Sequence, residues 1–114
     1  MEKLNKFELS ILERLSKKYH GIKNHIPHLR VLNREFTGVG MYVNLCYIDS
    51  KELVTNLEIL DGAISSNENI EIKGLQNGLG YEVDVSEGRL KFIEIITYGE
   101  NWDGYVGDYK FIQS

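Results

Sequence analysis

The chain has 114 residues, which is enough for one domain with a hydrophobic core of its own. It carries 17 acidic and 13 basic side chains, a formal net charge of -4, and its longest basic block is the pair Lys17-Lys18. Nucleic acids and anionic membranes are bound through basic surfaces, so this charge balance argues against both as partners. The single cysteine, Cys46, excludes an intramolecular disulfide, and its place in the apolar run 41–48 predicts a buried, inert thiol.

The N-terminal stretch lacks the features of a targeting segment. Glu2, Asn5 and Glu8 interrupt the continuous apolar run that a secretory signal needs. No apolar stretch reaches the roughly 18 residues of a membrane-spanning helix. We therefore expect a cytoplasmic protein.

Residues 4–19 have the periodicity of an amphipathic helix. Apolar side chains recur there at steps of three and four residues: Leu4, Phe7, Ile11, Leu12, Leu15 and Tyr19. Charged residues fill the other side, and His20-Gly21 supplies a C-terminal stop because glycine accepts the left-handed conformation of a helix cap. We expect this helix to pack on a sheet.

After a connector that holds the single proline, Pro27, the pattern changes to strands. Residues 29–36 and 41–48 read as strands, and the two glycines within 37–40 predict a turn that joins them as a hairpin. Residues 49–56 predict a polar loop or one short helical turn. A strand over 57–64, interrupted at Asp61-Gly62, and a short strand over 70–72 follow, and residues 108–112 predict a last strand at a sheet edge.

The clearest hairpin signal lies in residues 81–98. Tyr81, Val83 and Val85 alternate with acidic residues, as in a strand with one buried face. Residues 86–88 predict a three-residue loop, because Gly88 accepts a positive φ. The return strand over 89–98 is too apolar to be exposed on both faces, so we expect it to be central in the sheet.

These elements together predict an α+β fold. The chain would form a single domain over residues 1–114, with the N-terminal helix packed on an antiparallel sheet of about six short strands.

Glu94 is a candidate functional carboxylate because it interrupts the apolar run 92–96. Three interpretations stay open: Glu94 alternates outward onto a solvated face, it forms a buried ion pair with Arg34, or it is a functional group. With Glu35 as a second carboxylate, acid–base chemistry in a cleft between helix and sheet is a hypothesis, although the spacing does not fix their geometry.

Other motifs that would carry chemistry are weak. His20, His25 and His28 lie close together, but Pro27 forbids the helical spacing of a metal motif, so we expect solvated loop histidines and no metal. The glycine-rich stretches 38–40 and 74–80 lack the sequence that follows a phosphate loop, and we expect turns there and no cofactor. Cys46 has no local nucleophile signature.

The C-terminal region combines aromatic and acidic residues on a glycine-bounded loop. Its candidate binding residues are Tyr98, Glu100, Trp102, Asp103 and Tyr105, with Tyr109 nearby in sequence. Aromatic side chains supply much interface energy and acids steer a basic partner, so a protein-binding patch is one interpretation. The other interpretation is that these rings cap an open end of the sheet.

Two stretches resemble a family of small uncharacterised bacterial proteins. Residues 34–42 read REFTGVGMY, and residues 74–102 hold GL, then glycines 78, 80 and 88, and end in YGENW. The family has an RE-x-TG-x-G segment and a terminal YG-E-x-W segment. It has no assigned activity, so the resemblance implies a bacterial, compact α+β domain and carries over no site. Asp103 departs from the proline that the family has after the tryptophan.

Two classes of function follow from these observations. We expect a non-enzymatic interaction protein, such as an immunity-type protein that binds a basic partner through the C-terminal loop. The alternative is a small-molecule-binding or hydrolytic domain that uses Arg34, Glu35 and Glu94, which requires the three side chains to converge in one pocket. A homodimer built through an exposed sheet edge is compatible with either.

Overall fold

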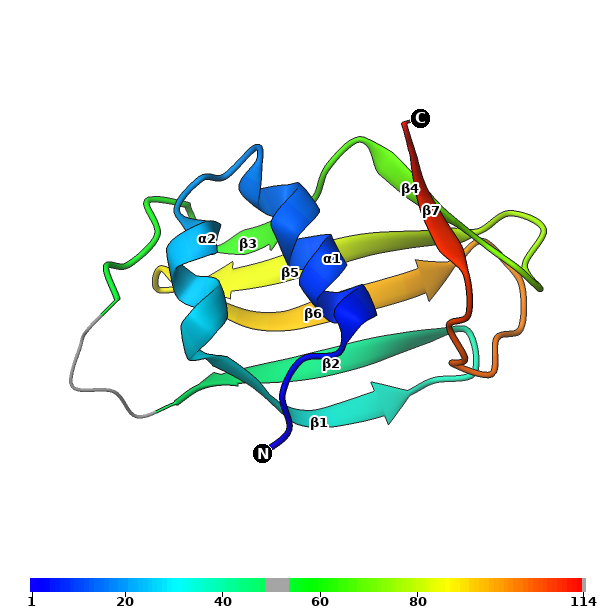
Figure 1. The fold of residues 1–114 in the computed structure, drawn as a ribbon, viewed down its shortest axis with the longest axis horizontal. Coiled ribbons are helices and arrows are strands. Elements are labelled where there is room, and N and C mark those ends of the chain that lie inside the picture. The colour runs from blue at the N-terminus through cyan, green and yellow to red at the C-terminus, as the bar shows by residue number, and fades with distance from the viewer. Residues whose placement is uncertain (49–53, 114) are drawn as a thin grey trace.

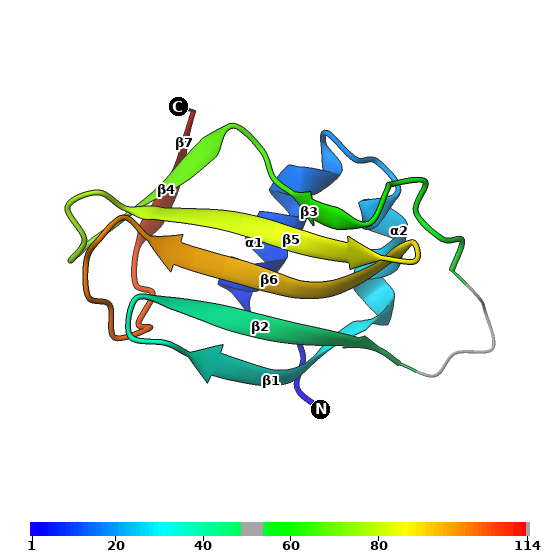
Figure 2. The ribbon, with the colours of Figure 1, turned by 180° about the vertical axis from the view of Figure 1, so that it is seen from behind.

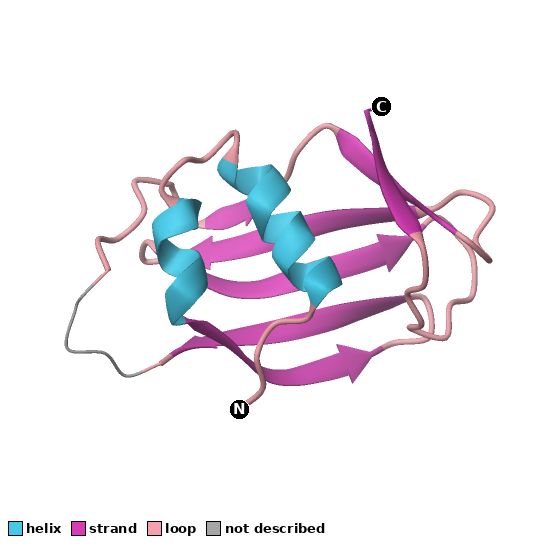
Figure 3. Cartoon of the chain, in the orientation of Figure 1, coloured by secondary structure: helices cyan, strands magenta, loops and turns pink. Residues whose placement is uncertain are grey.

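The computed structural model describes residues 1–48 and 54–113, and it has the expected α+β architecture (Figure 1). Helix α1 (Lys6–Ser16), the short helix α2 (Ile22–His25) and a 3-10 turn, η1 (Ile26–His28), precede the strands. The sheet is antiparallel throughout its described pairings and follows the order β1-β2-β6-β5-β4-β7, with β3 also paired to β5. Both helices lie on one face of the sheet, and none of the described elements covers the opposite face (Figures 2 and 3).

Helix α1 is shorter at both ends than the periodicity predicted. It begins at Lys6 because Asn5 and Glu8 form a capping box, in which each side chain accepts a hydrogen bond from the other residue's backbone N–H. It ends at Ser16, so Gly21 does not stop it and instead precedes α2. The connector before β1 was not predicted to be helical, and it forms α2 and η1.

The N-terminal hairpin is confirmed. Strands β1 (Leu29–Phe36) and β2 (Gly40–Tyr47) pair in antiparallel register around a turn in which Gly38 has a φ of 87°. A β-bulge between Val31 and Asn33 adds one residue, Leu32, to β1. The prediction for residues 49–53 lies outside the described residues, and residues 54–56 are loop.

The C-terminal hairpin is also confirmed, but its loop is shorter than predicted. Strands β5 (Leu79–Ser86) and β6 (Arg89–Thr97) flank a two-residue turn, Glu87-Gly88. Both turn residues have positive φ, 52° and 74°, as the right-handed twist of the flanking strands requires. The Asp61 carboxylate accepts a hydrogen bond from the Glu87 N–H at 2.8 Å and so supports a conformation that is rare for a glutamate.

The remaining strands lie beyond β5. Strand β3 covers only Gly62–Ile64, so the prediction of a strand over 57–60 is wrong: the Leu57 N–H donates to the Gly88 carbonyl at the hairpin turn, not to a strand ladder. Strand β4 (Glu68–Ile72) pairs with β7 (Tyr109–Gln113), which forms the predicted edge strand. Strand β6 is central, as its apolar sequence predicted.

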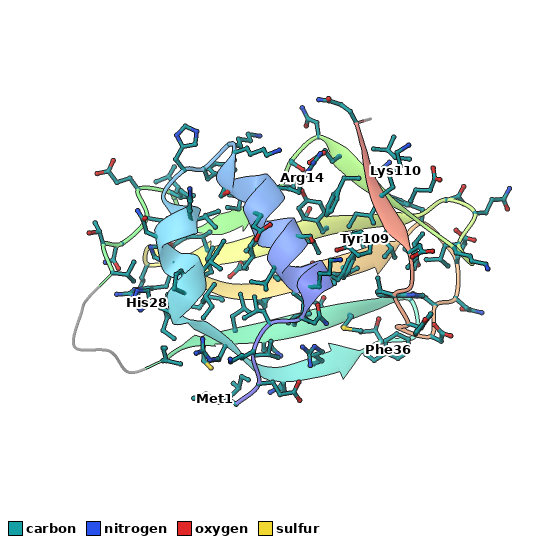
Figure 4. All side chains as sticks on the ribbon, viewed as in Figure 1. Met1, Arg14, His28, Phe36, Tyr109 and Lys110 are labelled. Carbon is teal, nitrogen blue, oxygen red and sulfur yellow. The ribbon has the colours of Figure 1, made fainter. Side chains whose placement is uncertain are left out.

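The core lies between α1 and the covered face of the sheet. From the helix it takes fully buried residues, Ile11, Leu12 and Leu15, and from the sheet Val43, Val83, Ile93 and Ile95. Arg14, near the end of α1, pairs with Glu68 of β4 and lies 5.0 Å from the Phe111 ring centroid of β7 (Figure 4). The helix therefore packs on both the central strands and the β4–β7 pair.

A buried ion pair fixes the start of α1 on β1. The Arg34 guanidinium donates from Nε to Glu8 Oε2 at 2.7 Å and from Nη2 to Glu8 Oε1 at 2.9 Å, a bidentate geometry. Glu8 is buried, and Arg34 also donates to the exposed Glu2 carboxylate at 2.8 Å. Hydrogen bonding to Glu8 raises the pKa of Arg34 further above its ordinary value. The ion pair of Arg34 with Glu94, one of the three interpretations of Glu94, is therefore not formed, because the partner of Arg34 lies on the helix.

His25 is buried, contrary to the prediction that all three histidines are solvated. Its imidazole lies 2.8 Å from the Tyr47 hydroxyl through Nδ1 and 2.8 Å from the Thr55 carbonyl through Nε2. His20 is exposed, and His28, which is labelled in Figure 4, is half-buried. Cys46 is half-buried on the uncovered face, 3.0 Å from the Met1 sulfur, so the prediction of a buried thiol is wrong.

We predict that Glu8→Gln lowers the free energy of unfolding by about 2 kcal/mol or more, because it removes the buried charge that Arg34 needs. Glu2→Gln is the matched control. It removes a carboxylate from the same arginine, but the Glu2 side chain is 73% exposed, so its loss is expected to cost less than about 0.5 kcal/mol. Urea unfolding followed by the fluorescence of the buried Trp102 measures both, and equal effects would contradict the assignment.

Candidate functional site

The uncovered face of the sheet collects the acidic candidates. Residues alternate along each strand, so the neighbours of buried core residues point away from the helices. Glu94 lies between Ile93 and Ile95, which are 0% and 1% exposed, and it therefore projects onto the uncovered face. Of the three interpretations of Glu94, the outward one is correct. We name this surface, seen toward the viewer in Figure 2, the open face.

One row of side chains crosses four strands of the open face. The register places Glu35 of β1 opposite Tyr42 of β2, Tyr42 opposite Glu94 of β6, and Glu94 opposite Glu82 of β5. Directly opposed residues have Cβ atoms about 5 Å apart, and like charges in that position repel. The row therefore holds three carboxylates, two of them facing each other directly in the centre of the sheet.

A second row beside it combines amide, aromatic and acidic side chains. Asn33, Asn44, Phe92 and Asp84 follow one another across the same four strands. The Asn44 side chain donates to the Asn33 oxygen at 2.7 Å and to Glu35 at 3.2 Å. The Phe92 ring packs edge-to-face on Tyr42, with centroids 5.5 Å apart. The two rows together present aromatic edges among four carboxylates.

Tyr98 extends the aromatic area toward the next row. The hydroxyl end of its side chain lies over Gly80, where a Cβ would overlap the hydroxyl oxygen. The Tyr98 hydroxyl donates to the Asn69 side chain at 2.8 Å, which holds the ring in place, and the residue remains 45% exposed. Gly80 is therefore the position at which this ring approaches the sheet.

The charges of the open face are not neutralised from within the part of the chain that the structure describes. None of the ion pairs formed there includes Glu35, Glu82, Asp84 or Glu94. Tyr42 is the neutral neighbour of the row: hydrogen bonding to the Glu94 carboxylate, together with the charges of Glu94 and Glu35, raises the pKa of the Tyr42 hydroxyl.

Arg34 lies on the other side of the sheet. It packs against the start of α1 and lines a hollow of about 380 Å³ there with Glu8 and Trp102. Glu35 and Glu94 share the open face but have no arginine between them. The three side chains do not converge in one pocket, so the geometry required by the small-molecule or hydrolytic alternative is absent.

The C-terminal loop does not form one exposed patch. Trp102 is 6% exposed; its backbone N–H donates to the Gly38 carbonyl and its ring packs on Phe36. The Glu100 carboxylate accepts hydrogen bonds from the backbone N–H groups of Gln76 and Asn77, both at 2.8 Å. The loop thus closes one end of the sheet.

The other loop candidates have separate surroundings. Asp103 accepts a hydrogen bond from the Tyr105 N–H at 2.9 Å within a local turn. The Tyr105 side chain is 74% exposed, whereas Tyr109 packs on Phe7 of α1 with ring centroids 4.9 Å apart. Of the aromatic candidates, Tyr98 alone is placed beside the carboxylate rows.

Sequence reasoning missed Tyr42, Glu82, Asp84 and Phe92 as members of this surface. The signal for the two acids was present, because both alternate with buried residues along β5. Their meeting with Glu35 and Glu94 depends on the pairing order of four strands, which no local pattern encodes.

In residues 1–48 and 54–113, no helix is long and apolar enough to cross a membrane. The same part of the chain holds no group of three or more His, Cys, Asp or Glu side chains placed to bind a metal ion. No protein-family model, no curated protein and no solved structure matches the chain.

We predict that Glu82→Gln raises the free energy of unfolding by up to about 1 kcal/mol, because it relieves the repulsion from Glu94. Glu71→Gln is the matched control. Glu71 is exposed and lies opposite Lys110 in the β4–β7 ladder, so removing its charge is expected to lower stability slightly. Urea midpoints at low salt compare the two. A destabilised Glu82→Gln protein would show that the opposed carboxylates do not repel.

Proposed function

We propose that this protein binds a basic protein partner through the open face and acts as a non-enzymatic interaction protein. The observation that carries the proposal is the direct opposition of Glu82 and Glu94, beside Glu35 and Asp84, with no described cation paired to any of them. Opposed carboxylates lower the stability of the free protein. A partner that brings positive charge to this row relieves the repulsion when it binds.

The aromatic side chains of the open face support the same proposal. Tyr42 and Phe92 are half-buried and in contact, and the Tyr98 hydroxyl lies over Gly80 and donates to Asn69. Rigid aromatic rings supply contact area with little loss of conformational entropy, and tyrosine is enriched at binding hot spots. Acidic groups around them steer a basic partner and raise its association rate.

The charge of the open face also bears on the homodimer. Two copies packed through this face would bring like charges together, so we expect no dimer there. One edge of the sheet is partly occupied, because Glu2 and Val31 exchange both backbone hydrogen bonds along β1. Strand β7 is the outermost strand and β4 separates it from β5, so a dimer through the outer edge of β7 would leave the open face available.

An immunity-type role accommodates these properties. Such a protein blocks a partner toxin by covering it, and it needs charge complementarity rather than a catalytic group. The resemblance to small bacterial proteins agrees with a bacterial origin, and we propose the cytoplasm as the site of action. A basic toxin surface is the partner chemistry that the open face fits.

We predict that the triple variant Glu35→Gln, Glu82→Gln, Glu94→Gln loses the partner. The matched control neutralises three exposed acids at other positions, Glu13→Gln, Glu71→Gln and Asp108→Asn. Both variants change the net charge equally, so they separate the open face from the overall charge. Affinity capture from the source cell compares the three baits, and calorimetry with the purified partner measures affinity.

The expected result is a basic, stoichiometric partner retained by the parent protein and the control variant, with Kd weakened about tenfold or more by the open-face variant. If both variants lost affinity for the partner equally, the interaction would depend on net charge alone. If both retained their affinity, the open face would not be part of the interface. Trp102→Ala does not test the proposal, because this buried ring packs against Phe36 and its loss disturbs the fold.

A further inference from the structure

The loop between β4 and β5 holds the one asparagine–glycine pair of the sequence, Asn77-Gly78. Figure 1 shows this loop, in yellow-green, at one end of the sheet and beside the orange loop that follows β6. A backbone nitrogen can attack the side-chain amide of the residue before it, and the attack closes a five-membered ring. Glycine hinders this attack least because it has no Cβ, so the pair has the composition of a reactive site.

Both reacting groups of the pair are free of hydrogen bonds within the described part of the chain. Asn77 is exposed, and its side-chain amide forms no hydrogen bond with a described residue. The Gly78 N–H precedes the β5 ladder, which begins at Leu79, and it donates to no described acceptor. The loop is held instead by the N–H groups of Gln76 and Asn77, which donate to the Glu100 carboxylate at 2.8 Å each. These bonds leave the Asn77 Cγ and the Gly78 nitrogen available to each other.

Three comparable positions of the chain are engaged in hydrogen bonds. Asn101 is exposed like Asn77, but the nitrogen that would attack it belongs to Trp102 and donates to a backbone carbonyl at 2.9 Å. An aspartate before a glycine can close the same ring, and the carboxylates of Asp61 and Asp103 each accept a backbone N–H, at 2.8 and 2.9 Å. Among these four positions, Asn77 alone has both reacting groups unengaged by the described residues.

We propose that Asn77 is a site of spontaneous deamidation, at which the residue is converted to aspartate and isoaspartate without an enzyme. The Gly78 nitrogen bonds to Asn77 Cγ, and the bond from Cγ to the side-chain nitrogen breaks. That nitrogen leaves as ammonia with the proton that Gly78 gives up. Water then opens the cyclic imide: cleavage at Cγ gives aspartate, and cleavage at the main-chain carbonyl carbon gives isoaspartate. No atom is oxidised or reduced, so water is the one co-reactant.

The two products affect the loop differently. Aspartate keeps the main chain unchanged and adds a carboxylate next to Glu100, which already binds the N–H of the same residue. Isoaspartate adds a carboxylate as well, and it also lengthens the main chain by one carbon atom. We therefore expect charge repulsion from both products and a displacement of the loop from isoaspartate alone.

The packing after residue 77 determines where the added carbon atom is accommodated. Gly78 lies against β4, where even a Cβ would overlap the Ile70 carbonyl oxygen. Leu79 is fully buried and begins the β5 ladder, so it is fixed as well. The lengthened chain must therefore displace the residues before Gly78, and their N–H groups separate from the Glu100 carboxylate. Isoaspartate at this site thus releases the β4–β5 loop from the C-terminal loop.

The rate of ammonia loss from the folded protein tests the proposal. The purified parent protein is incubated at pH 6.5 and at pH 8, and peptide mass spectrometry locates each gain of about 1 Da. We expect Asn77 to react about ten times faster than Asn101, or more, because the Trp102 nitrogen is engaged in a hydrogen bond. The rate at Asn77 should be higher at pH 8, because the Gly78 nitrogen must lose its proton. Electron-transfer fragmentation distinguishes isoaspartate from aspartate in the product.

Two variants complete the test. Asn77→Gln keeps the amide and the charge but would have to close a six-membered ring, so its peptide should gain no mass. Asn77→Asp has the charge of the product and a normal main chain. It should lose less hydrogen-exchange protection at the Gln76 N–H than the isoaspartate form, which we expect to lose about tenfold. The proposal is overturned if Asn77 keeps its amide in the folded protein, if Asn101 reacts as fast, or if Asn77→Gln gains the same mass. Equal protection of Gln76 in the isoaspartate form and in Asn77→Asp would show that the loop is not released.

Discussion

The bidentate contact between Glu8 and Arg34 is the interaction on which the arrangement of this protein depends. Glu8 completes the capping box that starts α1, and the same carboxylate accepts both guanidinium bonds from β1. One residue therefore determines where the helix begins and which strand its first turn meets. Because a buried carboxylate without a partner is costly, the helix cannot move away from β1 without exposing or stranding this charge.

Covering one face of the sheet decides the character of the other. Val43, Ile93 and Ile95 are buried under the helices, so the residues that alternate with them, Tyr42 and Glu94, point to the open face. The strand order then places Glu35 and Glu82 beside them. A surface selected for stability alone would place lysine opposite one of these glutamates. The repulsion between carboxylates on the open face thus lowers the stability of a fold whose other face is well packed against the helices. Such local losses of stability are common at functional surfaces.

The elements that were predicted correctly are those whose apolar residues recur with a regular local period. The stripe from Phe7 to Leu15 and the alternation from Tyr81 to Val85 gave the helix, the hairpins and the α+β class, because each pattern reports which side of an element is buried. The partner of Arg34 was missed because Glu8 lies 26 positions away and on a helix. His25 was missed because its burial depends on Tyr47 and Thr55, and the Glu87-Gly88 turn because a glutamate seldom adopts positive φ.

Strand β4 is joined less extensively to β5 than to β7. One register pair, Ile70 with Leu79, connects these strands, whereas β4 and β7 pair over five positions. The β4–β7 ribbon is also tied to α1, by Arg14 to Glu68 and by the Ser10 and Tyr109 hydroxyls at 2.8 Å. Side chains therefore hold the β4–β7 pair on both sides, Arg14 and Ser10 from α1 and Tyr81 from β5, whose ring packs on Phe111, so a force on the C-terminal strand would be shared between the helix and the central sheet.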